Sequence, residues 1–231
     1  MNPVNLVHLR TIQINEFIRI NGWNAFFKEV IHWNRKAIMV QKDLSEAKFH
    51  EDLFKDENVE FFELHPGTFS GRKLAYALKS RYLKARYYLG KGYRGHALVR
   101  GNEVIGDIWY YAPGEANGGS DHPDLHWLGI TLDPASVYSF DIHVVPNERG
   151  KNLSAALQNS SMYDLHKKGY AKAYAYYWAD NIPAVWNTRV INRWKEVKEI
   201  PVSRFFLFRM VGEIHEDNRL STKIPADRGG D

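Results

Sequence analysis

The residues from Phe140 to Ala156 read FDIHVVPNERGKNLSAA and combine an apolar strand, a short loop and the start of a helix. The helix is expected to begin near Lys151, and its first N–H groups have no acceptor within the helix. These donors, the positive end of the helix dipole and the cations of Arg149 and Lys151 would together attract an anion. The segment therefore predicts a seat for a phosphate group, with an ordinary strand, loop and helix crossover as the alternative.

A second feature is the absence of acidic residues between Gly71 and Asn102, a stretch that is rich in lysine and arginine. Its apolar residues recur at steps of three and four, which predicts an amphipathic helix within residues 71–94. The opposite face of this helix would be basic. That face is either an ordinary solvated surface or a positive wall near an anionic ligand, single-stranded nucleic acid included.

The segment GKGYRG, Gly90 to Gly95, matches the glycine pattern of dinucleotide-binding loops. Such a loop needs a strand before the glycines and a helix after them. Here the expected helix precedes them, and a hairpin with its turn at Gly101 and Asn102 follows. We therefore interpret these glycines as a helix stop.

The segment DHPDLH offers oxygen and nitrogen ligands at Asp121, His122, Asp124 and His126. Pro123 disrupts the helical spacing that would bring the two histidines side by side, and no zinc-protease pattern surrounds them. We expect a loop without a metal, in which His122 could bind an acceptor molecule.

The remaining pattern predicts an order of elements that runs through most of the chain. Residues 1–58 contain helix-like stretches and a short strand candidate at 37–41, and they are interpreted as an N-terminal extension. A polar C-terminal tail is expected at 215–231. Between them the expected elements are a strand at 59–64, the basic helix, a hairpin at 96–111, a loop-rich stretch at 112–136, a strand at 137–145, a helix at 151–168, a strand at 173–180, a helix at 182–194 and a hairpin at 196–211.

Composition limits the class of protein. A chain of 231 residues with 44% hydrophobic content is expected to form one main folded domain. The sequence has no cysteine, which excludes disulfides, zinc–thiolate sites and a thiol nucleophile and fits a cytoplasmic location. No apolar run approaches the roughly 20 residues that span a bilayer, so no membrane partner is expected.

Two motifs with the right separation resemble the acetyl-CoA motifs of the GNAT superfamily of N-acetyltransferases. In that family, Val-x-Pro leads into Arg/Gln-x-x-Gly-x-Gly/Ala, and here the first arginine is Arg149 while the two glycine positions fall on Asn152 and Ser154. Asparagine tolerates a positive φ and serine is small, which suits both positions. The second match is KKGYAKAYAYYWADNIPA, which ends in the family's Asn-x-x-Ala at Asn181 and Ala184. The resemblance implies that Asn181 caps the next helix and contacts the pantetheine arm, with Ala184 in the first turn of that helix.

The resemblance implies an α/β (α+β) fold for residues 59–214. The expected architecture is a mixed, mostly antiparallel sheet that is flanked by helices and splays between the strand at 138–145 and the strand at 173–179. Acetyl-CoA, or another acyl-CoA, would bind in that gap. The cofactor-binding residues implied by the resemblance are Ile142, Val144, Arg149, Gly150, Lys151, Asn152, Leu153, Ser154, Asn181 and Ala184.

The implied reaction is direct attack of a neutral amine on the thioester carbonyl, whose oxygen a backbone N–H near Ile142 to Val144 would polarise. The family's base lies near the central strand, where the candidates are Tyr138, Asp141 and His143. Strand alternation turns Asp141 and His143 to the face opposite Tyr138 unless a bulge intervenes.

The family's general acid, a tyrosine, maps onto Thr188, which is a poorer proton donor than a phenol. Solvent, Tyr138 or Tyr177 would then protonate the leaving thiolate, or the chain is a CoA-binding module with weak catalysis. A nucleic-acid-binding protein that uses the helix at 71–94 is the weaker alternative. The sequence leaves the amine acceptor open, and the seven tryptophans and the FFLF strand could contribute a homodimer surface.

Overall fold

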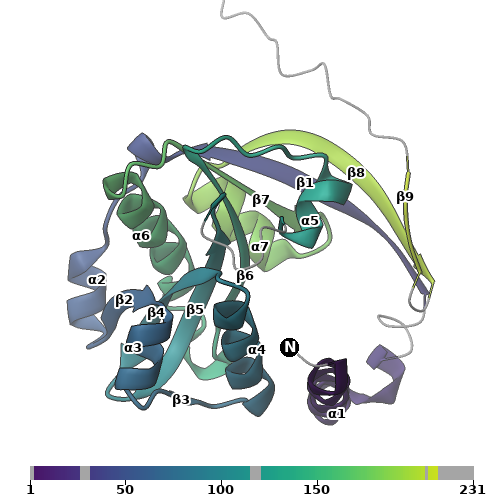
Figure 1. The fold of residues 1–231 in the computed structure, drawn as a ribbon, viewed down its shortest axis with the longest axis horizontal. Helices are drawn as coiled ribbons and strands as arrows, with labels where there is room; N and C mark the ends of the chain where they lie inside the picture. The colour runs from purple at the N-terminus through teal and green to yellow at the C-terminus, as the bar shows by residue number, and fades with distance from the viewer. Residues whose placement is uncertain (1–2, 27–31, 115–120, 206–207, 213–231) are drawn as a thin grey trace, which may run out of the picture.

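A mixed β-sheet organises the chain (Figure 1). The computed structural model describes residues 3–26, 32–114, 121–205 and 208–212. Within these residues the strand order is β2-β4-β5-β6-β7-β1-β8-β9, with the two-residue strand β3 beside β5. The strands are β1 His32–Asp43, β2 Glu60–Leu64, β3 Ala75–Tyr76, β4 Arg94–Arg100, β5 Glu103–Tyr111, β6 Ser136–Val144, β7 Lys172–Trp178, β8 Lys195–Phe205 and β9 Phe208–Val211.

The sheet is antiparallel along most of its width, and β6 and β7 form the parallel pair at its centre. These two strands pair only from Ser136 opposite Lys172 to Tyr138 opposite Tyr174. Beyond Tyr138 they separate, so β6 keeps its hydrogen-bonded neighbour β5 on one side and opens a gap on the other. The splayed, mostly antiparallel sheet expected from the sequence is confirmed.

Helices cover both faces of the sheet. Helix α6 (Leu153–Lys167) packs on one face together with α2 (Glu51–Asp56) and α7 (Ile182–Val185). The other face carries α3 (Pro66–Gly71), α4 (Lys79–Gly90) and α5 (Pro123–Leu128). Helix α1 (Pro3–Phe26) lies against α4 (Figure 1). The four buried clusters of the core divide between the two faces, and this arrangement fixes β5 and β6 between α4 and α6.

The hairpin β4–β5 explains the glycines of GKGYRG. Helix α4 ends at Gly90, and Gly101 has a left-handed φ of 62° in the turn that joins the two strands. A Cβ on Gly95 would lie 2.7 Å from the carbonyl oxygen of Ile108 and 3.0 Å from the Trp109 ring, so there is no room for a side chain at this position. The interpretation as a helix stop and hairpin, rather than a dinucleotide loop, is confirmed.

Part of the segment expected as an N-terminal extension belongs to the sheet. The strand candidate at 37–41 is longer than expected, and β1 lies between β7 and β8 and pairs with both. Ala37, Met39 and Val40 of this strand are all buried, because both faces of a central strand are covered. The sequence therefore lacks the alternation of apolar and polar residues that marks a strand with one exposed face. The proposed domain boundaries themselves stay a prediction.

The basic helix is shorter than the sequence pattern indicates. The apolar steps from Leu74 onward suggested one helix, but the structure has the two-residue strand β3 before α4 begins at Lys79. Among the described residues, no helix has the length and apolar character needed to cross a membrane. The polar tail at 215–231 lies outside the described residues.

Candidate functional site

A bulge in β6 shapes the edge of the gap. Asp107 of β5 lies opposite His143 and Trp109 lies opposite Phe140, so two residues of β6, Asp141 and Ile142, face one residue of β5. Asp141 has a left-handed φ of 53°. The extra residue shifts the alternation, which turns Asp141 and His143 to the α4 face that also carries Phe140.

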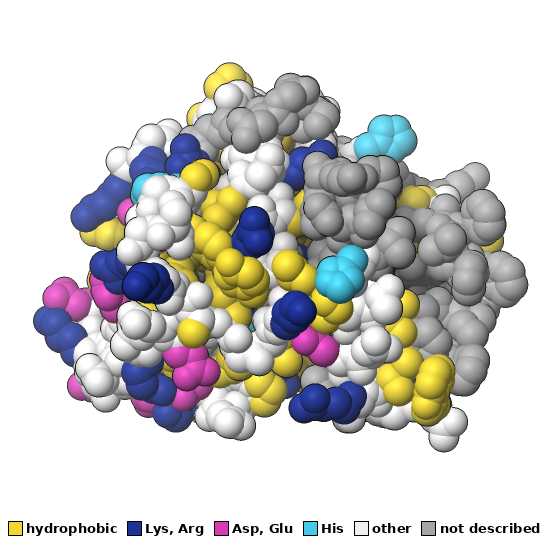
Figure 2. All heavy atoms as spheres, turned by 60° about the horizontal axis from the view of Figure 1, so that its bottom comes forward, with side chains coloured by type: hydrophobic (Ala, Val, Ile, Leu, Met, Phe, Trp, Pro, Cys, Tyr) yellow, Lys and Arg dark blue, Asp and Glu magenta, His cyan; other side chains and the backbone are white. Residues whose placement is uncertain are grey.

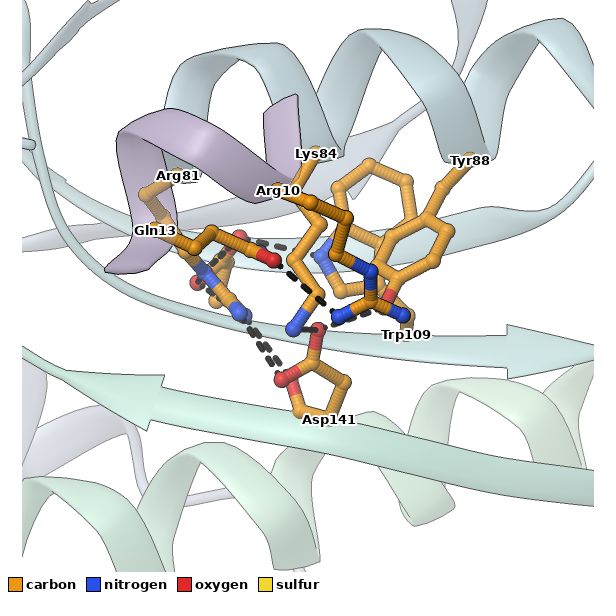
Figure 3. Close-up of polar contacts among 8 residues, drawn as sticks. Arg10, Gln13, Arg81, Lys84, Tyr88, Trp109 and Asp141 are labelled. Atoms are coloured by element: carbon orange, nitrogen blue, oxygen red, sulfur yellow. Dashed lines mark hydrogen bonds and ion pairs between the residues drawn. The ribbon is translucent and has the colours of Figure 1, made fainter. Parts of the chain in front are cut away.

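Asp141 is the centre of a charged cluster beneath α4 (Figure 3). Its carboxylate contacts Arg81 at 2.8 Å and Lys84 at 2.7 Å, and the hydroxyl of Tyr88 donates to it at 2.7 Å. Burial alone would raise the pKa of Asp141, but the cations of Arg81 and Lys84 hold that pKa well below its usual range. Asp141 is therefore ionised at neutral pH and is a weak proton acceptor.

Arg81 connects this cluster to the core. Its guanidinium reaches Asp107 at 2.8 Å and also donates to the backbone oxygen of Asp141 at 2.8 Å. Asp107 accepts a further hydrogen bond from the indole of Trp109 at 3.0 Å. Since the side chain of Arg81 is only 8% exposed, α4 is fixed to the bulge by a buried ionic contact.

The N-terminal helix α1 covers the outer side of the same cluster. In the view of Figure 3, Arg10 of α1 is drawn in front of Lys84 and Tyr88 and Gln13 in front of Arg81, and Arg10 donates to the Gln13 side chain at 3.1 Å. The Glu16 carboxylate accepts from the backbone N–H of Ser80 at 3.4 Å, in the first turn of α4. A molecule approaching the bulge from this side would pass beside α1.

His143 lines a small cavity with Tyr76, Arg81 and Asp107. Burial lowers the pKa of His143 to about 4, and the nearby charge of Arg81 adds to this effect. The imidazole is therefore neutral at pH 7, and its ring makes no hydrogen bond within the described part of the chain.

Tyr138 and His122 lie farther along the same face. The hydroxyl of the fully buried Tyr138 donates to Asp124 at 3.2 Å, and the His122 ring packs on Phe140 with 4.3 Å between ring centroids. Nδ1 of His122 accepts from the backbone N–H of Asp124 at 3.2 Å, which places the proton of the neutral ring on Nε2. Burial lowers the pKa of His122 to about 4, so this neutral form prevails at pH 7.

The predicted phosphate seat lies where β6 leads into α6. Ala156 is the first residue of α6 whose N–H reaches a helical carbonyl, that of Asn152, at 3.0 Å. The N–H groups of residues 150–155 have no acceptor among the described residues. Gly150 and Asn152 both have left-handed φ values, 85° and 59°. Asn152 thus adopts the conformation for which glycine is favoured, and the donor set fits a phosphate group.

The two cations predicted at the seat differ in their surroundings. Arg149 is exposed, and its Nε donates to the carbonyl oxygen of Val144 at 3.3 Å at the edge of the gap. Lys151 instead contacts Glu57 at 2.9 Å and Glu148 at 3.1 Å. Arg149 is therefore the cation with guanidinium donors left for a ligand, whereas two carboxylates already offset the charge of Lys151.

Asn181 and Ala184 stand at the start of α7, at the end of β7. The side chain of Asn181 accepts from the backbone N–H of Ala184 at 3.3 Å, so Asn181 caps the helix as predicted. The helix continues as a π-helix, Trp186–Ile191. Asn187 in this segment donates to the Ser154 hydroxyl at 3.2 Å, which joins the π-helix to the first turn of α6.

Thr188 is buried in this π-helix and is 6% exposed. Its carbonyl accepts from the N–H of Trp194 at 3.0 Å. Tyr177, an alternative acid, donates to Glu196 at 2.5 Å, and burial followed by this hydrogen bond raises the pKa of Tyr177 above its usual value. Within the described residues, neither side chain forms a hydrogen bond with Asp141 or Ile142 of the bulge.

The basic surface expected from residues 71–94 is reduced by internal pairing. Arg81 and Lys84 point to Asp141, and Arg72 contacts Glu60 at 2.7 Å. Figure 2 shows separate lysine and arginine side chains on this face, interspersed with hydrophobic and acidic ones. Among the side chains that Figure 2 colours, the basic ones do not form the continuous strip that single-stranded nucleic acid would follow.

The partners of Asp141 were missed at the sequence level. Arg81, Lys84 and Tyr88 follow a spacing of three and four, which puts them on one helix face and is a usable signal. Their common acceptor lies more than 50 residues away in the chain, and it reaches them only because of the bulge. No local pattern marks that bulge.

No protein-family model and no curated protein sequence matches the chain. Solved structures do. The glucosamine N-acetyltransferase region of a fungal multi-domain β-N-acetylglucosaminidase, described as GCN5-related, matches with a TM-score of 0.52 and 18% identity over 79% of this chain and 22% of that one.

Two weaker matches have TM-scores below 0.5. A GNAT-family acetyltransferase from Novosphingobium aromaticivorans has a TM-score of 0.47 and 10% identity over 74% of this chain and 64% of that chain. Arabidopsis thaliana NAA60 in complex with acetyl-CoA has a TM-score of 0.37 and 16% identity over 64% of this chain and 98% of that chain.

The match covers 22% of the length of the fungal protein, which is less than two thirds of it. The likeness at this identity concerns the fold. The strand order, the parallel pair that separates after Tyr138 and the loop into α6 agree with it. The chain has the fold of the GNAT superfamily of N-acetyltransferases.

Proposed function

We propose that this protein binds acyl-CoA, with acetyl-CoA as the first candidate, in the gap between β6 and β7 and transfers the acyl group to an amine. The observation that carries the proposal is the set of N–H groups at 150–155, which lack acceptors within the described residues and adjoin the gap. A pyrophosphate would accept from these donors. The fold agrees with this placement.

The chain's own residues divide into three groups in this proposal. The N–H groups at 150–155 and the side chain of Arg149 would hold the phosphates, and Asn181 would contact the pantetheine arm. Bound acyl-CoA would supply a thioester carbonyl as the acyl donor. Backbone N–H groups near Ile142 to Val144 would polarise its oxygen, because β7 no longer pairs with β6 there.

For the base, we propose His143 ahead of Asp141 and Tyr138. The neutral imidazole of His143 lies on the α4 face and has no hydrogen-bond partner in the described residues. Asp141 already accepts from three side chains, and the hydroxyl of Tyr138 is engaged by Asp124. A pKa near 4 makes His143 a weak base, so we expect slow proton transfer at pH 7.

A CoA-binding module with little catalysis is the second candidate. Thr188 replaces the tyrosine that would serve as general acid, and it is buried. Single-turnover transfer from acetyl-CoA to a panel of amines separates the two candidates. Transfer faster than the uncatalysed rate supports the enzyme, whereas tight binding without transfer supports the module.

The test of binding is calorimetric titration of acetyl-CoA into the wild type and into Arg149→Glu. Lys167→Glu is the matched control, because it makes the same charge change at the opposite end of α6. We expect Arg149→Glu alone to weaken binding, at least tenfold. Equal loss in both variants would indicate a general charge effect and would remove the proposed seat.

A further inference from the structure

A network of buried amide side chains joins the π-helix that follows α7 to the first turn of α6. Asn187, Asn192 and Gln158 are 8%, 3% and 4% exposed. Nδ2 of Asn192 lies 3.2 Å from the carbonyl oxygen of Ala155 and 2.7 Å from Oε1 of Gln158. The same nitrogen lies 3.3 Å from Oδ1 of Asn187, and Nδ2 of Asn187 lies 3.2 Å from the hydroxyl oxygen of Ser154. Buried polar groups that are linked in this way fix one another's orientation.

The direction of these hydrogen bonds follows from a backbone group that can only accept. The carbonyl oxygen of Ala155 carries no proton, so the Asn192 atom that faces it must be the amide nitrogen. This nitrogen also faces Asn187, which must present its oxygen there, because the reverse orientation would bring two NH2 groups together. The NH2 group of Asn187 is thereby directed to Ser154.

Ser154 is therefore the acceptor in its contact with Asn187, and its own hydroxyl proton is left to donate. A serine hydroxyl has one proton to give and two lone pairs that can accept. Within the described residues, no oxygen or nitrogen accepts the proton of Ser154. The side chain is half-buried and belongs to the first turn of α6, so its hydroxyl adds a donor beside the N–H groups of residues 150–155.

A hydroxyl with a fixed role favours an anion over a neutral ligand. A free serine side chain can rotate either to donate or to accept, whereas Asn187 already donates to Ser154 and leaves the hydroxyl as a donor. The N–H and the O–H of Ser154 belong to one residue, so a phosphate oxygen that accepts from the first lies within reach of the second. Hydrogen bonds to a charged oxygen are also stronger than those to a neutral one.

We propose that the Ser154 hydroxyl donates a hydrogen bond to a phosphate oxygen of the coenzyme, and that Asn187 is the positioning residue that holds this hydroxyl as a donor. The inference rests on the proposed function, since it assumes that CoA binds at the seat formed by residues 150–155. Ser154 stands at a position where glycine or alanine would offer no side-chain donor. The two sequence motifs do not include Asn187.

The test measures CoA binding by calorimetry for the wild type, Ser154→Ala, Asn187→Leu and the variant with both substitutions. Asn187→Ala replaces Asn187→Leu if the latter does not fold, as judged by circular dichroism. Ser161→Ala is the matched control, because Ser161 lies later in the same helix and its hydroxyl donates to the carbonyl oxygen of Leu157 at 2.7 Å. The binding of pantetheine, which has no phosphate, is followed by NMR for the same proteins.

We expect Ser154→Ala to weaken CoA binding about tenfold or more, the loss of one hydrogen bond to a charged group, and to leave pantetheine binding unchanged. Asn187→Leu should weaken CoA binding when Ser154 is present. It should add little to Ser154→Ala, because Asn187 acts through the hydroxyl that this variant lacks. Ser161→Ala should bind CoA as the wild type does.

Unchanged CoA affinity in Ser154→Ala, or an equal loss in Ser161→Ala, would overturn the inference. Additive losses in the double variant, or an equal loss of CoA and pantetheine binding in Asn187→Leu, would overturn the positioning role of Asn187, because they would indicate a general effect on the packing of the π-helix. If the wild type does not bind CoA at all, the proposed function fails and this inference fails with it.

Discussion

Replacing Arg81 tests the contact that fixes α4 to the bulge of β6. The Arg81 side chain is 8% exposed and lies between Asp107, which is 1% exposed, and Asp141, which is 21% exposed. Among the described residues, Arg81→Met leaves the buried Asp107 carboxylate with the indole of Trp109 as its one remaining hydrogen-bond donor. Breaking a buried pair in this way costs about 3–5 kcal/mol of unfolding free energy. For a chain of this size that corresponds to a fall in Tm of roughly 6–20 °C.

The assay is urea unfolding followed by tryptophan fluorescence and circular dichroism, with Lys84→Met as the comparison. Lys84 also contacts Asp141, but its side chain is 30% exposed, so its loss should cost less than about 1 kcal/mol. Adding Asp107→Asn to Arg81→Met should recover part of the stability, because the orphaned charge disappears. The reasoning is refuted if Arg81→Met costs no more than Lys84→Met, or if the second substitution lowers stability further.

Three further predictions follow from individual contacts. Asn181→Ala removes the cap of α7 and should lower the free energy of unfolding, measured in urea, by about 1 kcal/mol. An unchanged free energy of unfolding would mean that the cap does not stabilise the protein. The folded pKa of His143, about 4, lies below its reference value of 6.5, so its contribution to stability is complete above pH 6.5 and is lost as pH falls toward 4. A ring-proton NMR titration with a midpoint near 6.5 would contradict this. Gly95→Ala should cost about 1–3 kcal/mol because its Cβ meets the Ile108 carbonyl, whereas Gly90→Ala, with open space, should not destabilise.

Local signals in the sequence account for much of the fold. The turn at Gly101, the strand before Pro146 and the cap at Asn181 all depend on residues close in the chain, and the structure has each of them. The central position of β1 was missed, because pairing with β7 and β8 is set by contacts more than 100 residues apart.

The candidate site shows the same division. The left-handed Asn152 was predictable from the residue type, since asparagine adopts that conformation readily. The bulge at Asp141 was not predictable from the sequence, because it depends on the register between β6 and β5. The cations that contact Asp141 come from α4, far away in the chain. The roles of Tyr138, Asp141, His143 and Thr188 in catalysis stay predictions.

The most direct test of the central claim is a backbone amide NMR titration of the protein with CoA. If the phosphates occupy the seat, the amide signals of residues 150–155 should show the largest saturable shifts, followed by those of residues 142–144 at the gap. Saturable shifts that instead gather on α4, or no saturable shift at residues 150–155, would contradict the account.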